Sequence, residues 1–364
     1  MRQFSLRAHA SPISCILSLS PQQVLTADET GQVITWDLTT RRPTHQWQAH
    51  TDAVLTMIPW HNYVITHSRD HTVKFWFNGK LAYEFPINAL NYTNIVLLNG
   101  SYLVTPATTD STNIDIYKLT RDPVGITRVI ANYSAYETLH SVKNSDLAGR
   151  KDFGIIMQMA VIQDEIYIGY ESGDIVGLKL LHAPPSIPKH HHHDDESSTS
   201  LINKDAGLKL TYHNNSHVPE PVISLADLNG ILVSGSTTNT LIVHTDPVRQ
   251  IKYHGSGIKS VLAYDEELIV AFWDGSIDYH GEIIQRPLPH LNDNGDGDGD
   301  GDANDKNRIR LTYMTSLKPI DQVSASADDG KFGRVKHSRA IKKDVSINLL
   351  LAGYEDGSII AYDI

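Results

Sequence analysis

The sequence has little cysteine and no long hydrophobic run. Among its 364 residues there is one cysteine, Cys15, so an intrachain disulfide and a cysteine-based zinc site are excluded, which suits a reducing compartment. The most apolar stretch, residues 347–352, is far too short to span a bilayer, and the first ten residues lack the apolar core of a signal peptide. We therefore expect a soluble protein inside the cell, with no membrane partner.

An excess of positive charge is also lacking. The chain has 31 Lys and Arg against 42 Asp and Glu, which gives a formal net charge of −11. Most of the acidity lies in residues 189–196 and 292–307, and the rest of the chain is close to neutral. Because a general nucleic-acid binder needs a cationic surface, we expect no direct contact with nucleic acid.

No long segment shows helical periodicity, and a short pattern recurs instead. Each copy is an apolar strand, a tight turn, and a second strand that ends near an aromatic or apolar anchor residue. The anchors are Trp36, Trp76, Tyr117, Leu178, His244, His280 and Tyr362. Three of the gaps between them are 40, 41 and 36 residues, near the roughly 40–45 residues of a WD-repeat blade. The longer gaps each contain a polar insertion.

This pattern predicts an all-β fold, a seven-bladed WD-repeat β-propeller that occupies residues 1–364 as a single domain. After Tyr362 too little chain remains for the outer strand of the last blade. We therefore predict that the N-terminal strand, residues 3–8, pairs with that blade and closes the ring, which removes an open sheet edge. Loop insertions are expected at about 121–151, 182–217, 289–308 and 321–345, and a short helix is compatible with the first of them.

The best constellation of polar residues lies in the second blade. His50, Ser68, Asp70 and Trp76 match the hydrogen-bonded tetrad of a WD repeat: Asp70 accepts from the imidazole, Ser68 relays, and the indole of Trp76 donates. The same residue types would suit a Ser-His-Asp hydrolase. We favour the structural role because the His and Asp recur with the repeat period, and we predict no catalytic residues.

The first blade contains part of the same pattern. His9 and Trp36 occupy the histidine and tryptophan positions, but Thr30 stands where the aspartate is expected. We therefore expect an incomplete tetrad in this blade, and the later blades lack most of the pattern.

Two segments resemble metal sites in composition. Residues 296–301, Asp-Gly-Asp-Gly-Asp-Gly, match the first half of an EF-hand loop, but its twelfth position is Asn307 and no amphipathic helices flank it. The histidines at 190–193 precede three acidic residues, yet nothing near them in the sequence fixes a coordination geometry. We expect disordered acidic loops, with no resident metal and no cofactor.

Two further parts of the sequence suit a binding surface. A spaced basic segment suits either a nuclear-import or anionic-partner patch or a solvated loop, and we favour the loop. It contains Lys331, Arg334, Lys336, Arg339, Lys342 and Lys343. Trp60 and Tyr63 follow a strand, where aromatic side chains are either binding hot spots or packed. The sequence contains no phosphate-binding glycine loop, no HExxH and no GxSxG.

The segments LTADETGQVITWDL, HTDAVLTMIPW, VITHSRDHTVKFW and AGYEDGSIIAYDI resemble the fungal ASTRA-associated protein 1 family. This is a WD-repeat family similar to guanine nucleotide-binding protein beta subunit-like proteins. The resemblance is best over residues 1–120 and 346–364 and faint between them. It implies a subunit of the ASTRA assembly, found in the nucleus and compatible with the cytoplasm as well. That assembly contains a kinase-like scaffold, RuvB-like ATPases and Tel-two-interacting proteins.

The resemblance implies roles in chromatin regulation and in the stability and maturation of phosphatidylinositol-3-kinase-related kinases. It carries no catalytic residue over to this chain. The leading hypothesis is thus a non-enzymatic interaction scaffold, because a propeller presents two loop-bearing faces. The alternatives are a substrate receptor of a ubiquitin ligase or a G-protein-beta-like signalling adaptor, and an enzyme with a site at the central channel, for which we find no convergent polar residues. Fold alone does not decide among them.

Overall fold

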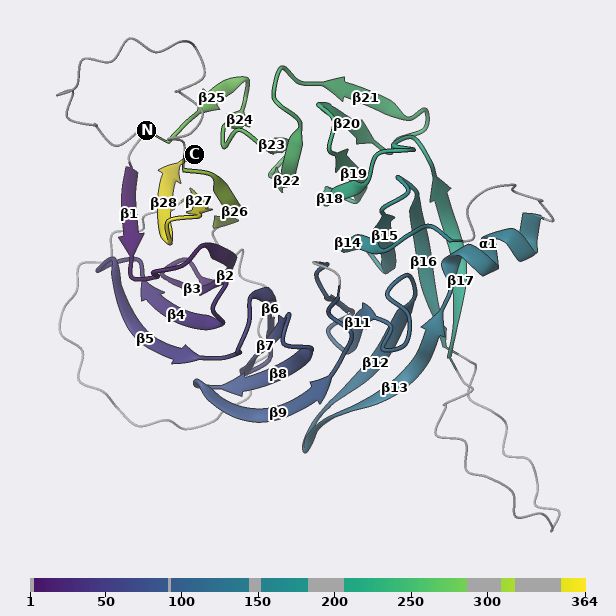
Figure 1. Ribbon diagram of the computed structural model, residues 1–364, viewed down its shortest axis with the longest axis horizontal. Helices are drawn as coiled ribbons and strands as arrows, with labels where there is room; N and C mark the ends of the chain where they lie inside the picture. The colour runs from purple at the N-terminus through teal and green to yellow at the C-terminus, as the bar shows by residue number, and fades with distance from the viewer. Residues whose placement is uncertain (1–2, 91–92, 144–151, 183–205, 287–308, 318–347) are drawn as a thin grey trace, which may run out of the picture.

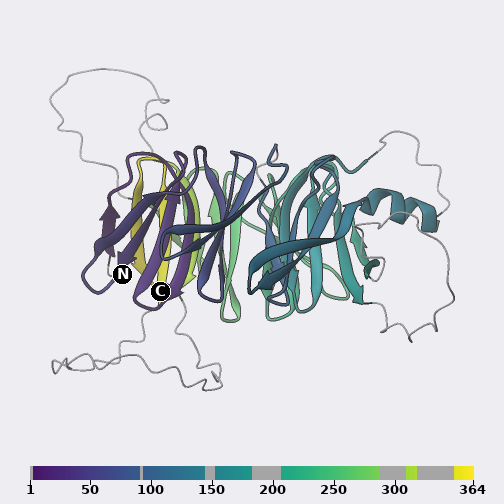
Figure 2. The ribbon, with the colours of Figure 1, turned by 90° about the horizontal axis from the view of Figure 1, so that it is seen from below.

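The computed structural model of the chain describes residues 3–90, 93–143, 152–182, 206–286, 309–317 and 348–364 (Figure 1). These residues form seven four-stranded antiparallel sheets arranged around a central axis. The structure confirms the predicted all-β, seven-bladed propeller. Seen from the side, the ring is a disc whose strands run between its two faces (Figure 2).

The first four blades follow one another along the chain. Blade 1 consists of β2 (Ile13–Ser20), β3 (Gln23–Asp28), β4 (Gln32–Asp37) and β5 (Arg42–Gln48). Blade 2 consists of β6 (Val54–Trp60), β7 (Tyr63–Ser68), β8 (Thr72–Phe77) and β9 (Lys80–Pro86). Blade 3 consists of β10 (Val96–Leu98), β11 (Tyr102–Pro106), β12 (Ile114–Arg121) and β13 (Val124–Tyr133). Helix α1 (Ala135–Lys143) leads to blade 4, which consists of β14 (Ile156–Ile162), β15 (Glu165–Tyr170), β16 (Ile175–His182) and β17 (Ala206–Asn214).

The last three blades complete the ring. Blade 5 consists of β18 (Val222–Leu228), β19 (Ile231–Ser236), β20 (Thr240–Val243) and β21 (Arg249–Lys252). Blade 6 consists of β22 (Ile258–Tyr264), β23 (Glu267–Phe272), β24 (Ile277–Tyr279) and β25 (Glu282–Ile284). Blade 7 consists of β26 (Leu311–Leu317), β27 (Leu349–Tyr354), β28 (Ser358–Asp363) and, from the other end of the chain, β1 (Gln3–Arg7).

The core lies between the blades. The described residues form seven hydrophobic clusters, and each combines side chains of two neighbouring blades. The second strands pack on both faces, which is why β27 is buried along its whole length. The fourth strands lie at the rim, and β21 is exposed along its length. This gradient explains why the sequence shows apolar runs in the middle strands and polar ones between them.

The two faces of the disc carry different loops. Because neighbouring strands are antiparallel, the turns between first and second strands and between third and fourth strands share one face, here named the hairpin face. The turns between second and third strands and the connections between blades share the other, here named the linker face. The segments that connect consecutive blades therefore lie at the linker face.

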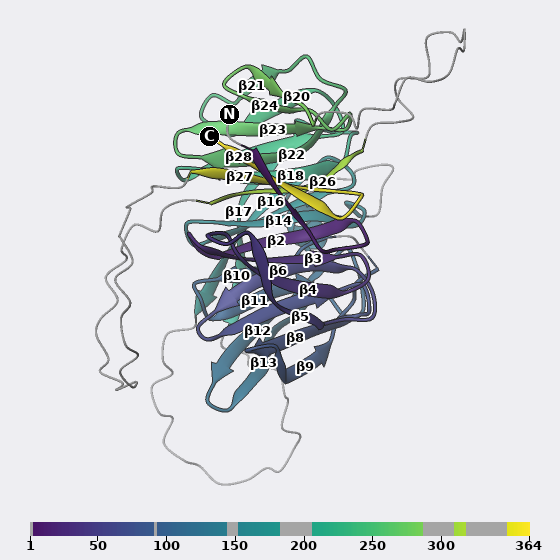
Figure 3. The ribbon, with the colours of Figure 1, turned by 90° about the vertical axis from the view of Figure 1, so that its left-hand side faces the viewer.

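The N-terminal strand closes the ring as predicted. β1 pairs antiparallel with β28 and becomes the outer strand of blade 7 (Figure 3). Leu6 lies opposite Ile359 and is 1 % exposed, within the cluster between blades 7 and 1. The pairing satisfies backbone groups on the outer side of β28, which would otherwise be an open sheet edge.

Glycine is required where two blades approach closely at the linker face. Gly31 and Gly357, in the turns between second and third strands of blades 1 and 7, have φ values of +85° and +74°. A Cβ atom would lie 2.2 Å from the carbonyl oxygen of His50 at Gly31, and 2.5 Å from that of His9 at Gly357. Only glycine fits both the left-handed conformation and the backbone contact.

Two of the expected insertions contain regular structure. The range 121–151 includes β13 and α1, and the range 182–217 includes β17. β17 was missed because residues 183–205 separate it in the sequence from β16, its partner in the sheet. Both predicted insertions were therefore too wide. The insertions expected at 289–308 and 321–345 lie outside the described residues.

Candidate functional site

Three of the four predicted tetrad residues belong to one buried network in blade 2. His50 Nδ1 lies 3.0 Å from Asp70 Oδ2, and His50 Nε2 lies 2.6 Å from Thr66 Oγ1. The indole Nε1 of Trp76 donates to the same hydroxyl at 2.8 Å. Every group is satisfied when His50 donates from Nδ1 to the carboxylate and accepts at Nε2 from Thr66. The network therefore runs Asp70–His50–Thr66–Trp76.

Ser68 stands outside this network, which corrects the relay assigned to it. Its hydroxyl donates to the carbonyl of Asp52 at 3.0 Å and accepts from the amide of Asp70 at 3.1 Å. Trp76 pairs with Val64 across the ladder, and Thr66 is two residues from that position on the same side of the strand. Ser68 is four residues from it, roughly 13 Å along the strand. It anchors the loop that carries Asp70.

Blade 1 contains a complete network, although the sequence predicted an incomplete one. His9 Nδ1 lies 2.7 Å from Asp28 Oδ2, His9 Nε2 lies 2.7 Å from Thr26 Oγ1, and Trp36 Nε1 donates to Thr26 at 2.8 Å. Thr30, which occupies the expected aspartate position, instead donates from its amide and its hydroxyl to the other oxygen of Asp28. A carboxylate two residues earlier in the turn reaches the same histidine nitrogen.

Blade 5 contains a variant of the network that the sequence analysis missed. Ser234 Oγ lies 2.8 Å from His217 Nε2 and 2.6 Å from His244 Nε2, and the hydroxyl of Tyr212 in blade 4 lies 2.7 Å from His244 Nδ1. Burial lowers the pKa of both histidines to about 4. The signal is a hydroxyl residue ten positions before the anchor, as at Thr26 and Thr66.

These networks act as staples of the fold. Thr26, Thr66 and Ser234 are fully buried, so no substrate reaches their hydroxyl groups. Burial alone would raise the pKa of Asp70, but the hydrogen bonds from His50 and Thr72 outweigh it and hold that pKa well below the usual range. The carboxylate therefore stays ionised and keeps His50 in place.

The other predicted positions have different outcomes. Trp60 is 4 % exposed and its indole donates to the carbonyl of Gly100 at 2.9 Å, so it is packed. Tyr63 is half-buried and lines a surface cavity. Residues 190–193 and 296–301 and the basic residues 331–343 lie outside the described part of the chain. Within that part, no three potential metal-ligating side chains gather, and no helix has the length and apolarity to cross a membrane.

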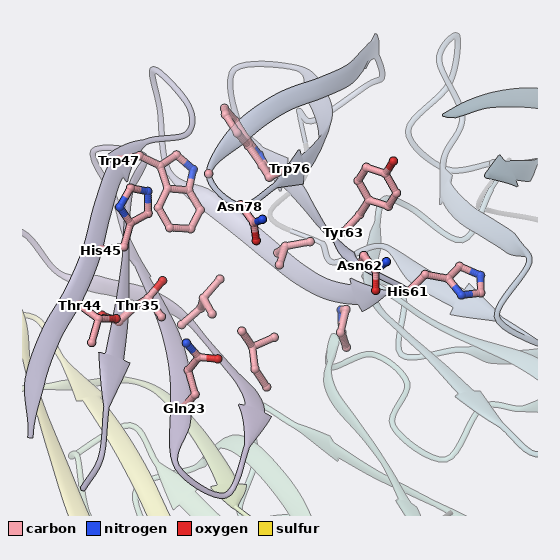
Figure 4. A pocket seen from close by; sticks show the side chains of 15 residues that line it. Gln23, Thr35, Thr44, His45, Trp47, His61, Asn62, Tyr63, Trp76 and Asn78 are labelled. Carbon is pink, nitrogen blue, oxygen red and sulfur yellow. The ribbon is translucent and has the colours of Figure 1, made fainter. Parts of the chain in front are cut away.

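The cavity beside Tyr63 lies between blades 1 and 2 near the hairpin face (Figure 4) and has a volume of about 420 Å³. A second cavity, of about 430 Å³, occupies the corresponding place between blades 5 and 6. The walls of the second cavity carry charge: Arg249, Glu266, Glu267 and Asp278. The first cavity has no Lys, Arg, Asp or Glu among its lining residues.

His67 in β7 is a buried histidine that the networks do not use. Its side chain is 0 % exposed, and neither ring nitrogen has a hydrogen-bond partner within the described structure. Burial is the main cause that lowers its pKa to about 3. A histidine with a depressed pKa destabilises the fold in acid, because the unfolded chain binds a proton below about pH 6.5 and the folded chain does not.

We expect His67→Leu to keep or raise stability at pH 7, since it removes a desolvated polar group. At pH 5 the gain should be larger by up to about 2 kcal/mol, because the wild-type chain loses stability as the pH falls from 6.5 towards 3 and the variant lacks this contribution. Urea unfolding at several pH values measures both quantities. His254→Leu, at an exposed position, is the control. An unchanged pH dependence in His67→Leu would contradict this account.

The fold and its networks define the class: a seven-bladed β-propeller closed by its N-terminal strand, with buried histidine–hydroxyl networks in blades 1, 2 and 5. The model of a protein family described as ASTRA-associated protein 1 matches residues 2–362. The chain is 47% identical to ASTRA-associated protein 1 of Lodderomyces elongisporus, covering 99% of this chain and 97% of that protein. It is 40% identical to the Candida tropicalis protein of the same name, covering 100% and 99%. The chain belongs to the ASTRA-associated protein 1 family.

Among solved structures, the chain is similar to the computationally designed Ika8 protein, with a TM-score of 0.54 and 15% sequence identity. The similarity covers 99% of this chain and 98% of that one. At this level of identity the likeness concerns the fold alone.

Proposed function

We propose that the chain is a non-enzymatic scaffold subunit of the ASTRA assembly. The relatives carry a name that associates them with ASTRA, and membership of their family supports the same association for this chain. In this proposal it acts in the nucleus, and also in the cytoplasm, in chromatin regulation and in the stability and maturation of phosphatidylinositol-3-kinase-related kinases. Its partners are the kinase-like scaffold, the RuvB-like ATPases and the Tel-two-interacting proteins.

The observation that carries the scaffold role is the way the structure uses its polar residues. The histidine, hydroxyl and carboxylate groups that resemble catalytic sets are buried as staples between strands. Large apolar side chains are exposed near the loops of both faces instead: Leu90 at 69%, Val218 at 50% and Trp273 at 47% on the linker face, and Phe77 at 45% and Leu81 at 49% beside the β8–β9 turn on the hairpin face. Exposed apolar and aromatic side chains on loops are features of protein-binding surfaces.

Affinity purification of the tagged chain from its native cell, followed by quantitative mass spectrometry, tests the proposal. We expect recovery of the RuvB-like ATPases, the kinase-like scaffold and the Tel-two-interacting proteins. A tagged Leu6→Asp chain is the control, because a charge at this buried position disrupts ring closure and should abolish the specific recovery. Recovery of cullin-adaptor components instead would favour a ubiquitin-ligase receptor, and recovery of none of these subunits would refute the proposal.

A further inference from the structure

The neutral cavity between blades 1 and 2 has the features of a binding site. One wall is the outer strand of blade 1, with Thr44, His45 and Trp47, and the other consists of the two hairpin turns of blade 2, with Asn62 and Asn78. Figure 4 shows the amide of Asn78 directed into the space between the blades, whereas the ring of His61 points away from it. The cavity is open to solvent along the hairpin face.

Several polar groups at this cavity have hydrogen-bonding capacity to spare. Within the described residues, the side-chain amides of Gln23, Asn62 and Asn78 make no hydrogen bond. The indole Nε1 of Trp47 is buried and has no partner there either. Because this nitrogen is buried, a ligand does not reach it, whereas the three side-chain amides are exposed and open to contact. Three amides on two blades provide both donors and acceptors.

The rest of the lining sets the character of the ligand. Leu19, Leu25, Pro59 and Val64 form an apolar part of the wall. The lining contains no Lys, Arg, Asp or Glu, so a cationic group would be desolvated there without a carboxylate partner, and an anionic group would find no lysine or arginine, with the imidazoles of His45 and His61 as the basic groups in the lining. The corresponding cavity between blades 5 and 6 is charged. The neutral lining therefore distinguishes this interface from the one between blades 5 and 6 and does not follow from propeller geometry.

The aromatic rings distinguish between two neutral ligands, a saccharide and a peptide. A saccharide needs a free aromatic face. The ring centroid of Trp47 lies 5.3 Å from that of His45, which stacks on it, and 6.2 Å from that of Trp76. The ring centroid of Tyr63 lies 5.9 Å from that of Trp60 and 5.7 Å from that of Phe77. The rings are thus engaged with one another. An extended peptide needs donors and acceptors along a wall and a recess for a side chain, and the cavity supplies both.

We propose that this cavity binds an uncharged, extended peptide segment of a partner protein, with an aliphatic side chain against Leu19, Leu25 and Val64 and with main-chain groups on Gln23 and Asn78. The inference rests on the proposed scaffold function and adds the chemistry of the segment that is bound.

A random peptide library displayed on phage and selected on the folded wild-type chain tests the inference. We expect enrichment of peptides that share an aliphatic position within an uncharged stretch. Synthetic versions should bind in fluorescence anisotropy, and the Gln23→Ala/Asn78→Ala variant should bind them at least tenfold more weakly. Asn62→Trp, which fills the cavity from an exposed turn, should have the same effect.

Matched controls separate lost binding from backbone strain. Asn78 precedes Gly79 in a turn with φ of +48°, and Asn99–Gly100 and Asn229–Gly230 form turns with the same first-residue conformation, at +51° and +52°. Neither lines the cavity. Asn99→Ala and Asn229→Ala should therefore bind the selected peptides as the wild-type chain does, and all variants should melt within a few degrees of it.

The outcomes separate this inference from the proposed function. No enrichment, equal binding by the cavity variants, a requirement for charged residues, or binding of neutral oligosaccharides in place of peptides would each overturn the inference. The affinity purification described above tests the scaffold role on its own. If the wild-type chain recovers the ASTRA subunits and shows none of the expected peptide binding, the inference fails and the proposed function stands.

Discussion

Removal of residues 1–8 is expected to lower the melting temperature by about 10 °C or more and to promote association between chains. The deletion takes away β1, whose five residues pair with β28 from Gln3–Tyr362 to Arg7–Ser358. It also removes Leu6 from the cluster that joins blades 7 and 1. β28 then becomes an exposed edge with unpaired backbone groups next to apolar side chains, which favours strand pairing between molecules.

Point variants in β1 show which of its side chains contribute to stability. Leu6→Ala should cost about 2–4 kcal/mol as a large-to-small substitution in a core, whereas Ser5→Ala, at an exposed position of the same strand, should change little. Differential scanning calorimetry and light scattering after size-exclusion chromatography measure stability and association. A deleted chain with an unchanged melting temperature and no more association than the wild-type chain would show that β1 does not close the ring.

Blade number and ring closure were predictable because they depend on pattern. The anchors Trp36, Trp76, Tyr117 and Tyr362 all lie on third strands, where packing on both sides demands apolar or aromatic residues. Because every blade needs such a residue on its third strand, these residues recur at a regular spacing in the sequence. The pairing of β1 follows from the same count, since a blade without a fourth strand leaves an open edge.

The composition of the staples was less predictable because it depends on register and turn shape. The relay belongs to Thr66, which lies beside the ladder position of Trp76, and Ser68 is farther along the strand. In blade 1 the carboxylate of Asp28 substitutes for one that was expected at Thr30. Side chains two residues apart in this turn can both reach the histidine Nδ1, and the sequence alone does not show which of them forms the hydrogen bond.

Replacement of Thr66 by Val tests the corrected relay. The shape is kept, but the only protein hydroxyl between His50 Nε2 and Trp76 Nε1 in the described network is lost. Two buried groups then lack partners, at about 1–3 kcal/mol each, so we expect Thr66→Val to destabilise the fold by about 2–4 kcal/mol. Thr26→Val should have a similar effect in blade 1, because the same contacts recur there.

Ser68→Ala is the matched comparison, since it removes a hydroxyl from the same strand without touching His50 or Trp76. We expect it to cost about 1 kcal/mol, the value of an ordinary buried hydrogen bond. Urea unfolding gives both values, and a double-mutant cycle of Thr66→Val with Trp76→Phe should show a coupling of about 1 kcal/mol or more. If Ser68→Ala proved the more damaging substitution, or if the cycle were additive, Thr66 would not be the residue that joins histidine to tryptophan. The hydroxyl ten positions before Trp36, Trp76 and His244 would then no longer indicate a blade held by such a network.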